Sequence, residues 1–389
     1  MDKNTDKSII YKELKGCFDF FYNEHSIGEF FGLTRDRTNN PDCSSIASTG
    51  YAFCAYVIGV KNGYIGFDEG YTFCEKTLDT FLKLDTVHGF FYHFINIKTG
   101  KKYYNDVSVI DTAILVCGML AAGEFFGGNV KQMAEKIFAG VEWNWYFDKN
   151  VNMFYMGYDE NRGFSGHWDW YAEQLMLYVL STASDNYSVD KCAYYNFKRN
   201  FNSYDNIKDI CYSYHGALFT YQFSHAFINF KDKKDSLGMD WFENSVKATM
   251  ASRLYSIDNP LNHKGYGDLM WGLTACDYDK GYQSYGALPA KENFDDGTVA
   301  PCGAIGSIIF LPDEVIKTMN NYSKYDKLWG KYGFYDSFNL NINFFAKSYV
   351  GIDKGISLVM LQNYIDGTIW NLLEKNKFIK KGLKILNIK

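Results

Sequence analysis

Residues 166–178 read GHWDWYAEQLMLY and set one carboxylate among aromatic and aliphatic side chains. We expect a helix that begins near Trp168 and carries Glu173 in its second turn, flanked by rings. A carboxyl group held against rings has a raised pKa, so it can keep its proton near neutral pH. Such a group can protonate a leaving glycosidic oxygen, while the rings stack on sugar faces. The alternative is a buried glutamate satisfied by neighbouring hydroxyls, which is the commoner role of a charged residue inside a helix.

Helical patterns with more than one apolar face recur along the chain, separated by loops that are short or very long in rough alternation. The helix predicted over Asp111 to Ala122 coincides with most of the best apolar run, Thr112 to Gly123, which has about half of the length that a membrane span needs. Such a helix suits an inner layer, where it packs on both neighbours and shows polar residues only to a central pocket. With about twelve helices, the sequence predicts an all-α fold, an (α/α)6 barrel or toroid, with long loops such as 256–297 at the active-site mouth.

Composition fits a single catalytic domain over residues 1–389, with a possible basic tail over residues 372–389. Aromatic residues make up 19% of the chain and prolines number only five, which suits long helices better than turn-rich sheets. The net charge of −5 comes from interspersed acids and bases, so no basic field favours nucleic acid, and a neutral ligand fits better. We expect neither a nucleic-acid nor a membrane partner, and the sequence leaves the oligomeric state open.

The nine cysteines are irregularly spaced and include no C-x-x-C pair, which favours a reducing compartment over a disulfide framework or a zinc knot. The first seven residues lack the apolar core of a signal peptide. We therefore expect a cytoplasmic protein, or a secreted or periplasmic one if a leader has been removed. The seven histidines lack metal-ligand spacing and no glycine-rich phosphate loop occurs, so we expect no metal and no cofactor.

Nine motifs follow one another in an order that is known from one family. They are Asp36–Arg37 with Ser45–Tyr51, Gly89–Phe94, Ser108–Ala113, Trp170–Glu173, Leu218–Ala226, Trp271–Asp277, Asp295–Pro301, Gly333–Asn339 and Tyr349–Gly355. With them the chain resembles, almost from end to end, the glucoamylase-like domain family. This family includes the β-1,2-glucan hydrolases of glycoside hydrolase family 144 and a domain of cyclic β-1,2-glucan synthases. The resemblance implies an (α/α)6 barrel that binds sugar at one mouth, in agreement with the helix count.

Four positions depart from the family pattern. Lys231 replaces an arginine and Gln362 a glutamate, while Lys354 and Ile356 alter the surroundings of Gly355. We expect the last two to influence which glycan binds.

Glycoside hydrolysis needs two carboxyl groups, one on either side of the scissile bond. With the resemblance, Glu173 is the predicted general acid, and Asp111 or Asp106 the predicted base or nucleophile. Asp111 begins a predicted helix and can serve as its cap instead. Asp106 shares the barrel mouth with it only if Asp106 lies outside that helix.

Further candidates are side chains that can bind sugar hydroxyls or stack on sugar rings, namely Arg37, Trp170, Tyr171, His225, Trp271, Asp277, Tyr285, Asp296 and Asp353. Structural alternatives exist for several of them. Asp277 can cap a turn in the longest loop, and Asp296 can form the turn before Thr298. Arg37 and His225 can instead support the core.

The preferred interpretation is a hydrolase of β-glucan or gluco-oligosaccharides, β-1,2-linked by resemblance and inverting. One alternative is a retaining transglycosylase on β-1,2-glucan, suggested by the synthase domains. Another is a carbohydrate-binding barrel without catalysis, suggested by the substituted residues after Asp353. The sequence leaves open whether a hydrolase would attack chain ends or the chain interior.

Overall fold

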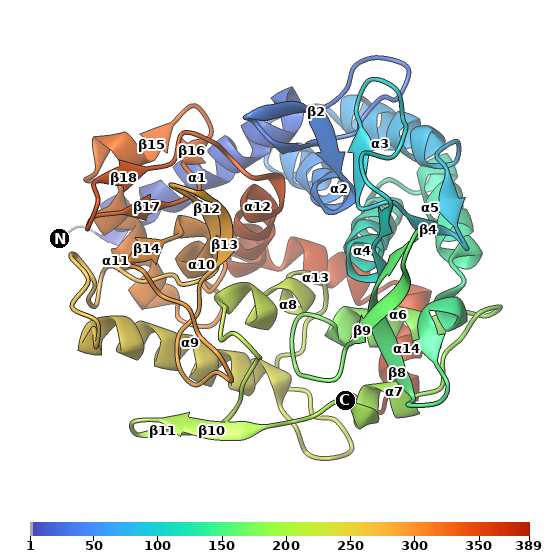
Figure 1. Cartoon of the computed structure of the whole chain (residues 1–389). Coiled ribbons are helices and arrows are strands. Elements are labelled where there is room, and N and C mark those ends of the chain that lie inside the picture. Colours follow the sequence, from blue (N-terminus) through green and yellow to red (C-terminus); the bar gives the residue numbers. More distant parts are fainter. Residues whose placement is uncertain (1–2) are drawn as a thin grey trace.

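The computed structural model describes residues 3–389, which form two concentric layers of helices (Figure 1). Six inner helices surround the centre: α2 (Ile46–Lys61), α4 (Val109–Phe126), α6 (Leu175–Ala183), α8 (Phe223–Phe227), α10 (Pro301–Ile305) and α12 (Gly351–Asp366). Six outer helices pack around them: α1 (Lys3–Asn23), α3 (Phe67–Phe81), α5 (Gly128–Gly140), α9 (Trp241–Asp258), α11 (Pro312–Tyr322) and α14 (Lys377–Ile385). The fold is therefore the predicted (α/α)6 barrel.

Shorter helices complete the barrel: α7 (Cys192–Asn196), α13 (Thr368–Leu373) and the 3-10 turns η1 (Trp143–Tyr146), η2 (Leu218–Tyr221) and η3 (Asp326–Leu328). Helix α13 directly follows the end of α12 and also contacts α4 and α8. The indole N–H of Trp370 in α13 donates to the carbonyl oxygen of His225, 2.6 Å away, in α8. Helix α13 thus closes the end of the barrel at which these inner helices terminate.

Helices α2 and α4 form the closest contact between inner helices. Side-chain caps begin them, since Ser45 Oγ accepts from Ser48 N and Ser108 Oγ accepts from Asp111 N. Where they cross, a Cβ on Gly118 would lie 1.9 Å from the carbonyl oxygen of Gly50. The two backbones therefore touch, and only glycine fits there.

Helix α4 is longer than the apolar run expected from the sequence. Its 18 residues are long and apolar enough to cross a membrane by length and composition alone. However, 83% of that window is buried inside the protein, so its apolar surface is covered by neighbouring helices. Helix α4 is the buried inner helix that an α/α barrel requires.

The C-terminal segment 372–389, expected as a basic tail, contains α14 instead. Phe378, Ile379 and Gly382 of this helix are buried. Helix α14 packs on α6 so closely that a Cβ on Gly382 would lie 2.1 Å from the carbonyl oxygen of Val179. It fills the outer position behind α6, and its lysines cover only its exposed side.

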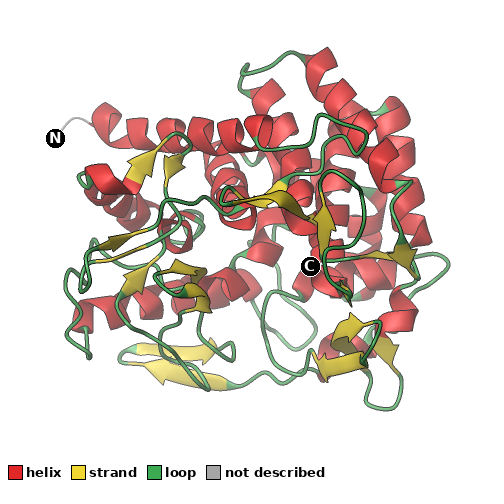
Figure 2. Cartoon of the chain, turned by 45° about the horizontal axis from the view of Figure 1, so that its top comes forward, coloured by secondary structure: helices red, strands yellow, loops and turns green. Residues whose placement is uncertain are grey.

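Short strands occupy the connections between helices (Figure 2). An all-α prediction therefore describes the barrel but misses eighteen strands of two to seven residues within residues 3–389. They are β1 (Arg35–Arg37), β2 (Asn40–Ser45), β3 (Thr86–Val87), β4 (Phe90–Phe91), β5 (Phe94–Asn96), β6 (Asp106–Val107), β7 (Phe147–Asp148), β8 (Met153–Asp159), β9 (Gly163–His167), β10 (Phe201–Tyr204), β11 (Ile207–Cys211), β12 (Ala275–Tyr278), β13 (Gly281–Ser284), β14 (Thr298–Val299), β15 (Trp329–Gly330), β16 (Gly333–Phe334), β17 (Phe338–Asn339) and β18 (Phe344–Phe345). Two antiparallel pairings matter for the site: β2 with β5, and the hairpin of β12 and β13.

Candidate active site

Several inner helices begin around one cavity of about 380 Å³. Ser45 at the start of α2, Asp111 in the first turn of α4 and Asp353 in the first turn of α12 all line it. Glu173, just before α6, completes the set. Helix N-termini carry a partial positive charge, which opposes the effect of burial on the carboxyl groups at this end of the barrel.

Glu173 lies in a turn that precedes α6, because α6 begins only at Leu175. The prediction that Glu173 occupies the second turn of a helix is therefore wrong. The side chain of Gln174 holds the turn, since its Oε1 accepts from Ala172 N and its Nε2 donates to the Trp170 carbonyl, both at 2.7 Å. Ser224 Oγ in α8 donates to the Glu173 carbonyl at 2.5 Å. These bonds fix the acid at the junction of two inner helices.

The surroundings of Glu173 favour its protonated form. Burial is the main reason that its pKa rises from 4.5 to about 7. A hydrogen bond from its own backbone amide opposes the rise, and the negative charge of Asp111 adds to it. At neutral pH, Glu173 can therefore hold a proton and deliver it to a bound ligand.

Asp111 and Asp106 are linked through His93. The distance from His93 Nε2 to Asp111 Oδ2 is 3.4 Å, and that from His93 Nδ1 to Asp106 Oδ2 is 3.0 Å. Although burial opposes it, the charges of both carboxylates raise the pKa of His93. Asp111 lines the cavity together with His93, whereas Asp106 is not among its lining residues. Of the two predicted partners of Glu173, the structure therefore brings Asp111 to the cavity and leaves Asp106 behind His93.

Arg37 forms another wall of the cavity. Its Nε donates to Asp36 Oδ2 at 2.7 Å and its Nη1 to Asp277 Oδ1 at 2.5 Å. Burial works against the charge of Arg37, but the neighbouring carboxylates raise its pKa overall. The ring centroid of Tyr282 lies 5.3 Å from Arg37 Cζ. Tyr282 is about half exposed, at the edge of the cavity. Arg37 and Tyr282 line the cavity, while Asp277 holds Arg37 from behind.

Asp353 is paired with Asp336, which also accepts from the Asp277 backbone amide at 2.6 Å. Both carboxyl groups are buried, at 5% exposure each. Burial and the charge of Asp353 raise the pKa of Asp336 well above its ordinary range. Because both groups are buried next to each other, ionisation of both at once is disfavoured. Of the two, Asp353 lines the cavity, whereas Asp336 lies behind it.

Trp170 and Tyr171 line a second cavity of about 350 Å³, which shares Glu173 and Phe219 with the first one. Trp170 is partly exposed. Tyr171 is 1% exposed and its ring stacks on Trp241, with centroids 4.7 Å apart. The structure thus brings both predicted aromatic residues next to the predicted acid.

Five predicted sugar-binding residues line neither cavity: Asp277, which holds Arg37 from behind, and four that lie elsewhere. His225 is packed between phenylalanines and bonds Ser245 through Nε2 at 3.0 Å; burial lowers its pKa to about 3, which keeps it neutral. Trp271 is fully buried and donates to Thr318 Oγ1 at 2.9 Å. Both are core residues, so their assignment to the site is wrong.

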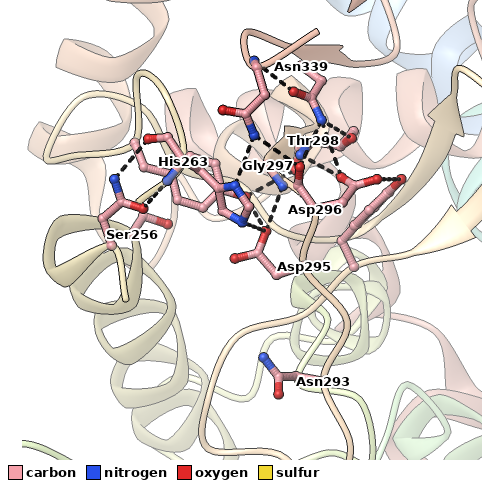
Figure 3. A network of polar contacts seen from close by, with 12 residues as sticks. Ser256, His263, Asn293, Asp295, Asp296, Gly297, Thr298 and Asn339 are labelled. Atoms are coloured by element: carbon pink, nitrogen blue, oxygen red, sulfur yellow. Dashed lines mark hydrogen bonds and ion pairs between the residues drawn. The ribbon is translucent and has the colours of Figure 1, made fainter. Parts of the chain in front are cut away.

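Asp296 belongs to the polar network that holds the long loop (Figure 3), and Tyr285 is bonded to it. Asp296 Oδ1 accepts from Thr298 N at 2.9 Å, which is the turn anticipated as the alternative role for Asp296. The Tyr285 hydroxyl donates to Asp296 Oδ2 at 3.3 Å. Neither residue lines either cavity, so the structure does not bring them to the predicted site.

The departures from the family pattern near Gly355 also lie outside the cavity. Lys354 is buried and its Nζ lies 2.5 Å from Glu13 Oε1 of α1, so it joins α12 to the outer layer. Ile356 is 1% exposed in the core. Their expected influence on the bound glycan has no direct route in this geometry.

Three site residues had no assigned role in the sequence: Asp36, His93 and Tyr282. Asp36 and His93 lie in two motifs that carry the resemblance, Asp36–Arg37 and Gly89–Phe94. Their place in these motifs is the signal in the sequence that could have identified them. Tyr282 lies in the long loop, where nothing separates it from neighbouring tyrosines. It reaches the cavity because β13 pairs it with Asp277 on β12.

The sequence profile of the Glycoamylase family matches residues 165–377, which is more than half of the chain. This chain belongs to the Glycoamylase family. A curated relative is the exo β-1,2-glucooligosaccharide sophorohydrolase (non-reducing end) of Parabacteroides distasonis, 28% identical over 99% of this chain. The Glycoamylase chain described here spans 58% of the length of that relative.

Solved structures of similar proteins have the same fold as this chain over almost its whole length. An endo-β-1,2-glucanase from Chitinophaga pinensis, in complex with sophorotriose and glucose, superposes with a TM-score of 0.90 at 26% identity, over 99% of this chain and 98% of the other. A β-1,2-glucanase from Parabacteroides distasonis gives a TM-score of 0.89 at 25% identity, over 98% of this chain and 60% of the other. The barrel fold is thus shared with these β-1,2-glucanases.

Proposed function

We propose that this Glycoamylase-family protein is a glycoside hydrolase that cleaves β-1,2-linked gluco-oligosaccharides. The names of its relatives support the substrate class. One observation carries the chemistry: Glu173, with a pKa of about 7, lines the same cavity as Asp111, which His93 contacts. A protonated carboxyl group and a carboxylate beside one sugar are the two groups that glycoside hydrolysis needs.

In the proposed reaction, Glu173 donates its proton to the glycosidic oxygen while the bond from that oxygen to C1 breaks. Asp111 removes a proton from a water molecule, whose oxygen forms the new bond to C1 from the opposite face of the ring. The products are two shorter saccharides, and the new reducing end has the inverted configuration. Glu173 then regains a proton from solvent, and Asp111 releases one.

The remaining cavity residues suit a neutral, hydroxyl-rich ligand. Arg37 donates from a rigid guanidinium, and the carboxyl group of Asp353 lines the same cavity. Phe94 stacks on His93 with ring centroids 3.8 Å apart and adds an apolar face. Several carboxyl groups also line this cavity, which disfavours anionic ligands.

The test is incubation of the protein with a panel of glucans that differ in linkage, followed by product analysis. We expect reducing sugar from β-1,2-glucan or its oligosaccharides and none from β-1,3- or β-1,4-glucan. NMR of the first-formed products should show the α-anomer, since inversion is proposed. A first-formed β-anomer would indicate retention, and binding without cleavage would refute the hydrolase. Product length over time separates cleavage at chain ends from internal cleavage.

A further inference from the structure

The second cavity meets the first at Glu173 and Phe219, which line both. Its walls come from two loops of the barrel mouth, the one before α6 and the one before η2, and Ser284 of β13 lies at its edge. Glu173 is thus accessible from both sides, whereas Asp111 lines the first cavity alone. This asymmetry gives the two cavities different roles around one acid.

Aromatic side chains in fixed orientations dominate the second cavity. Trp170 packs edge-on against Tyr214, with centroids 5.5 Å apart and planes at 75°. The indole N–H of Trp170 donates to the carbonyl oxygen of Tyr212 at 3.1 Å, and the Tyr214 hydroxyl donates to Glu292 Oε1 at 3.0 Å. Tyr214 remains 37% exposed. Rings held in this way offer a ready surface for stacking, because little freedom is lost on binding.

Trp168 also lines this cavity. It is 6% exposed, and its indole N–H has no hydrogen-bond partner within the part of the chain that the structure describes. A buried N–H without an acceptor costs free energy that a ligand oxygen can recover. Stacking rings beside a free donor are suited to a sugar, which has apolar faces and hydroxyl groups at its rim.

The positions of Glu173 and Asp111 determine which cavity holds the attacked sugar and which holds the departing sugar. The ring that undergoes attack must lie between acid and base, and only the first cavity is lined by both Glu173 and Asp111. The departing sugar lies on the other side of the oxygen that Glu173 protonates. We infer that the cavity walled by Trp168, Trp170 and Tyr214 binds the departing saccharide, by stacking and by the Trp168 N–H. This inference rests on the proposed hydrolase function.

The test compares Tyr214→Ala with the unaltered protein on β-1,2-linked oligosaccharides of three to six glucose units. A nitrophenyl glycoside with the same attacked sugar serves as a second substrate, since its leaving group needs little help from a sugar site. We expect kcat/KM of the unaltered protein to rise with chain length. Tyr214→Ala should lower kcat/KM on the hexasaccharide at least tenfold and on the nitrophenyl glycoside less than twofold.

The matched control is Tyr22→Ala, because Tyr22 is 39% exposed and its hydroxyl donates to Glu69 at 2.9 Å, far from both cavities. Tyr22→Ala should leave kcat/KM unchanged on both substrates. Trp168→Phe removes the N–H but keeps an aromatic ring, and we expect at least a threefold loss on the hexasaccharide alone.

Equal losses on both substrates, or an unchanged rise of kcat/KM with chain length in Tyr214→Ala and Trp168→Phe, would overturn the inference. If the nitrophenyl glycoside is not a substrate, the chain-length series decides by itself. If the unaltered protein cleaves no β-1,2-linked oligosaccharide, the proposed function fails, which is a different result from failure of the cavity assignment.

Discussion

Replacing Glu173 by glutamine should make the folded protein more stable at alkaline pH while it removes activity. The folded protein holds the pKa of Glu173 at about 7, compared with 4.5 ordinarily. The folded state thus keeps a proton that the unfolded chain has already lost between these two pH values. The contribution of Glu173 to stability is therefore largest below pH 4.5, falls as the pH rises from 4.5 to 7, and stays low above pH 7. Glutamine cannot ionise, so the variant avoids this loss.

The size of the effect follows from the pKa shift. One pKa unit corresponds to about 1.4 kcal/mol, so the shift would cost the folded state about 3 kcal/mol. Because Glu173 is partly exposed to the cavities, screening by solvent reduces this to about 2–3 kcal/mol. For a chain of 389 residues, the unfolding entropy turns that free energy into a rise in Tm of about 2–4 °C.

Thermal unfolding of both proteins at pH 4.5 and at pH 8 measures the prediction. Glu173→Gln should gain stability at pH 8 and little at pH 4.5, while hydrolysis falls by about 10²–10⁴ as for loss of a general acid. Glu29→Gln, at an exposed site, controls for the change in net charge. An equal Tm difference at both pH values, or near-normal turnover, would refute the reasoning.

Three further substitutions test other parts of the structure. His93→Asn removes the imidazole between Asp106 and Asp111, whose charges raise the pKa of His93, and should remove the titration of His93 from the pH profile of kcat/KM; a loss that is uniform with pH would mean a purely structural role. Gly118→Ala forces a methyl group into the Gly50 backbone and should cost about 3 kcal/mol in urea unfolding, whereas Gly140→Ala, with no atom within 4 Å, should cost nothing. Arg37→Ala leaves buried carboxylates without their cation and should cost about 2 kcal/mol; adding Asp277→Asn should restore part of it, and failure to do so would contradict the pairing.

Local signals in the sequence were sufficient where a helix is decided by its own residues. The sequence of residues 312–322 predicts a helix, because Pro312 suits the first turn and one face is apolar, and α11 has these bounds. The apolar pattern of residues 300–310 predicts a helix that reaches Phe310, whereas α10 ends at Ile305. Gln222 Nε2 of a distant segment donates to the Gly303 carbonyl at 2.7 Å and to Ser307 Oγ at 2.8 Å there. Such contacts between distant segments cannot be predicted from the hydrophobic periodicity of the sequence.

For the site, too, local sequence signals were sufficient for some residues, whereas others depend on contacts between distant segments. Glu173 and Asp111 were identified because their neighbours in the sequence carry the pattern. His93 was not assigned, because its place depends on the pairing of Ser45 with Phe94, two residues that are far apart in the chain. His225 and Trp271 were misplaced, because a polar side chain within a motif can serve the core as well as a ligand.

The contact between α14 and α6 has a consequence for synthesis of the protein. Helix α6 follows the turn that holds Glu173, and the helix that covers its outer side leaves the ribosome about 190 residues later. At a translation rate of about 5–20 residues per second, α14 becomes available to pack on α6 on the order of 10–40 s after α6 is made. During that interval, the segment around Val179 offers an uncovered apolar surface to chaperones or to neighbouring nascent chains.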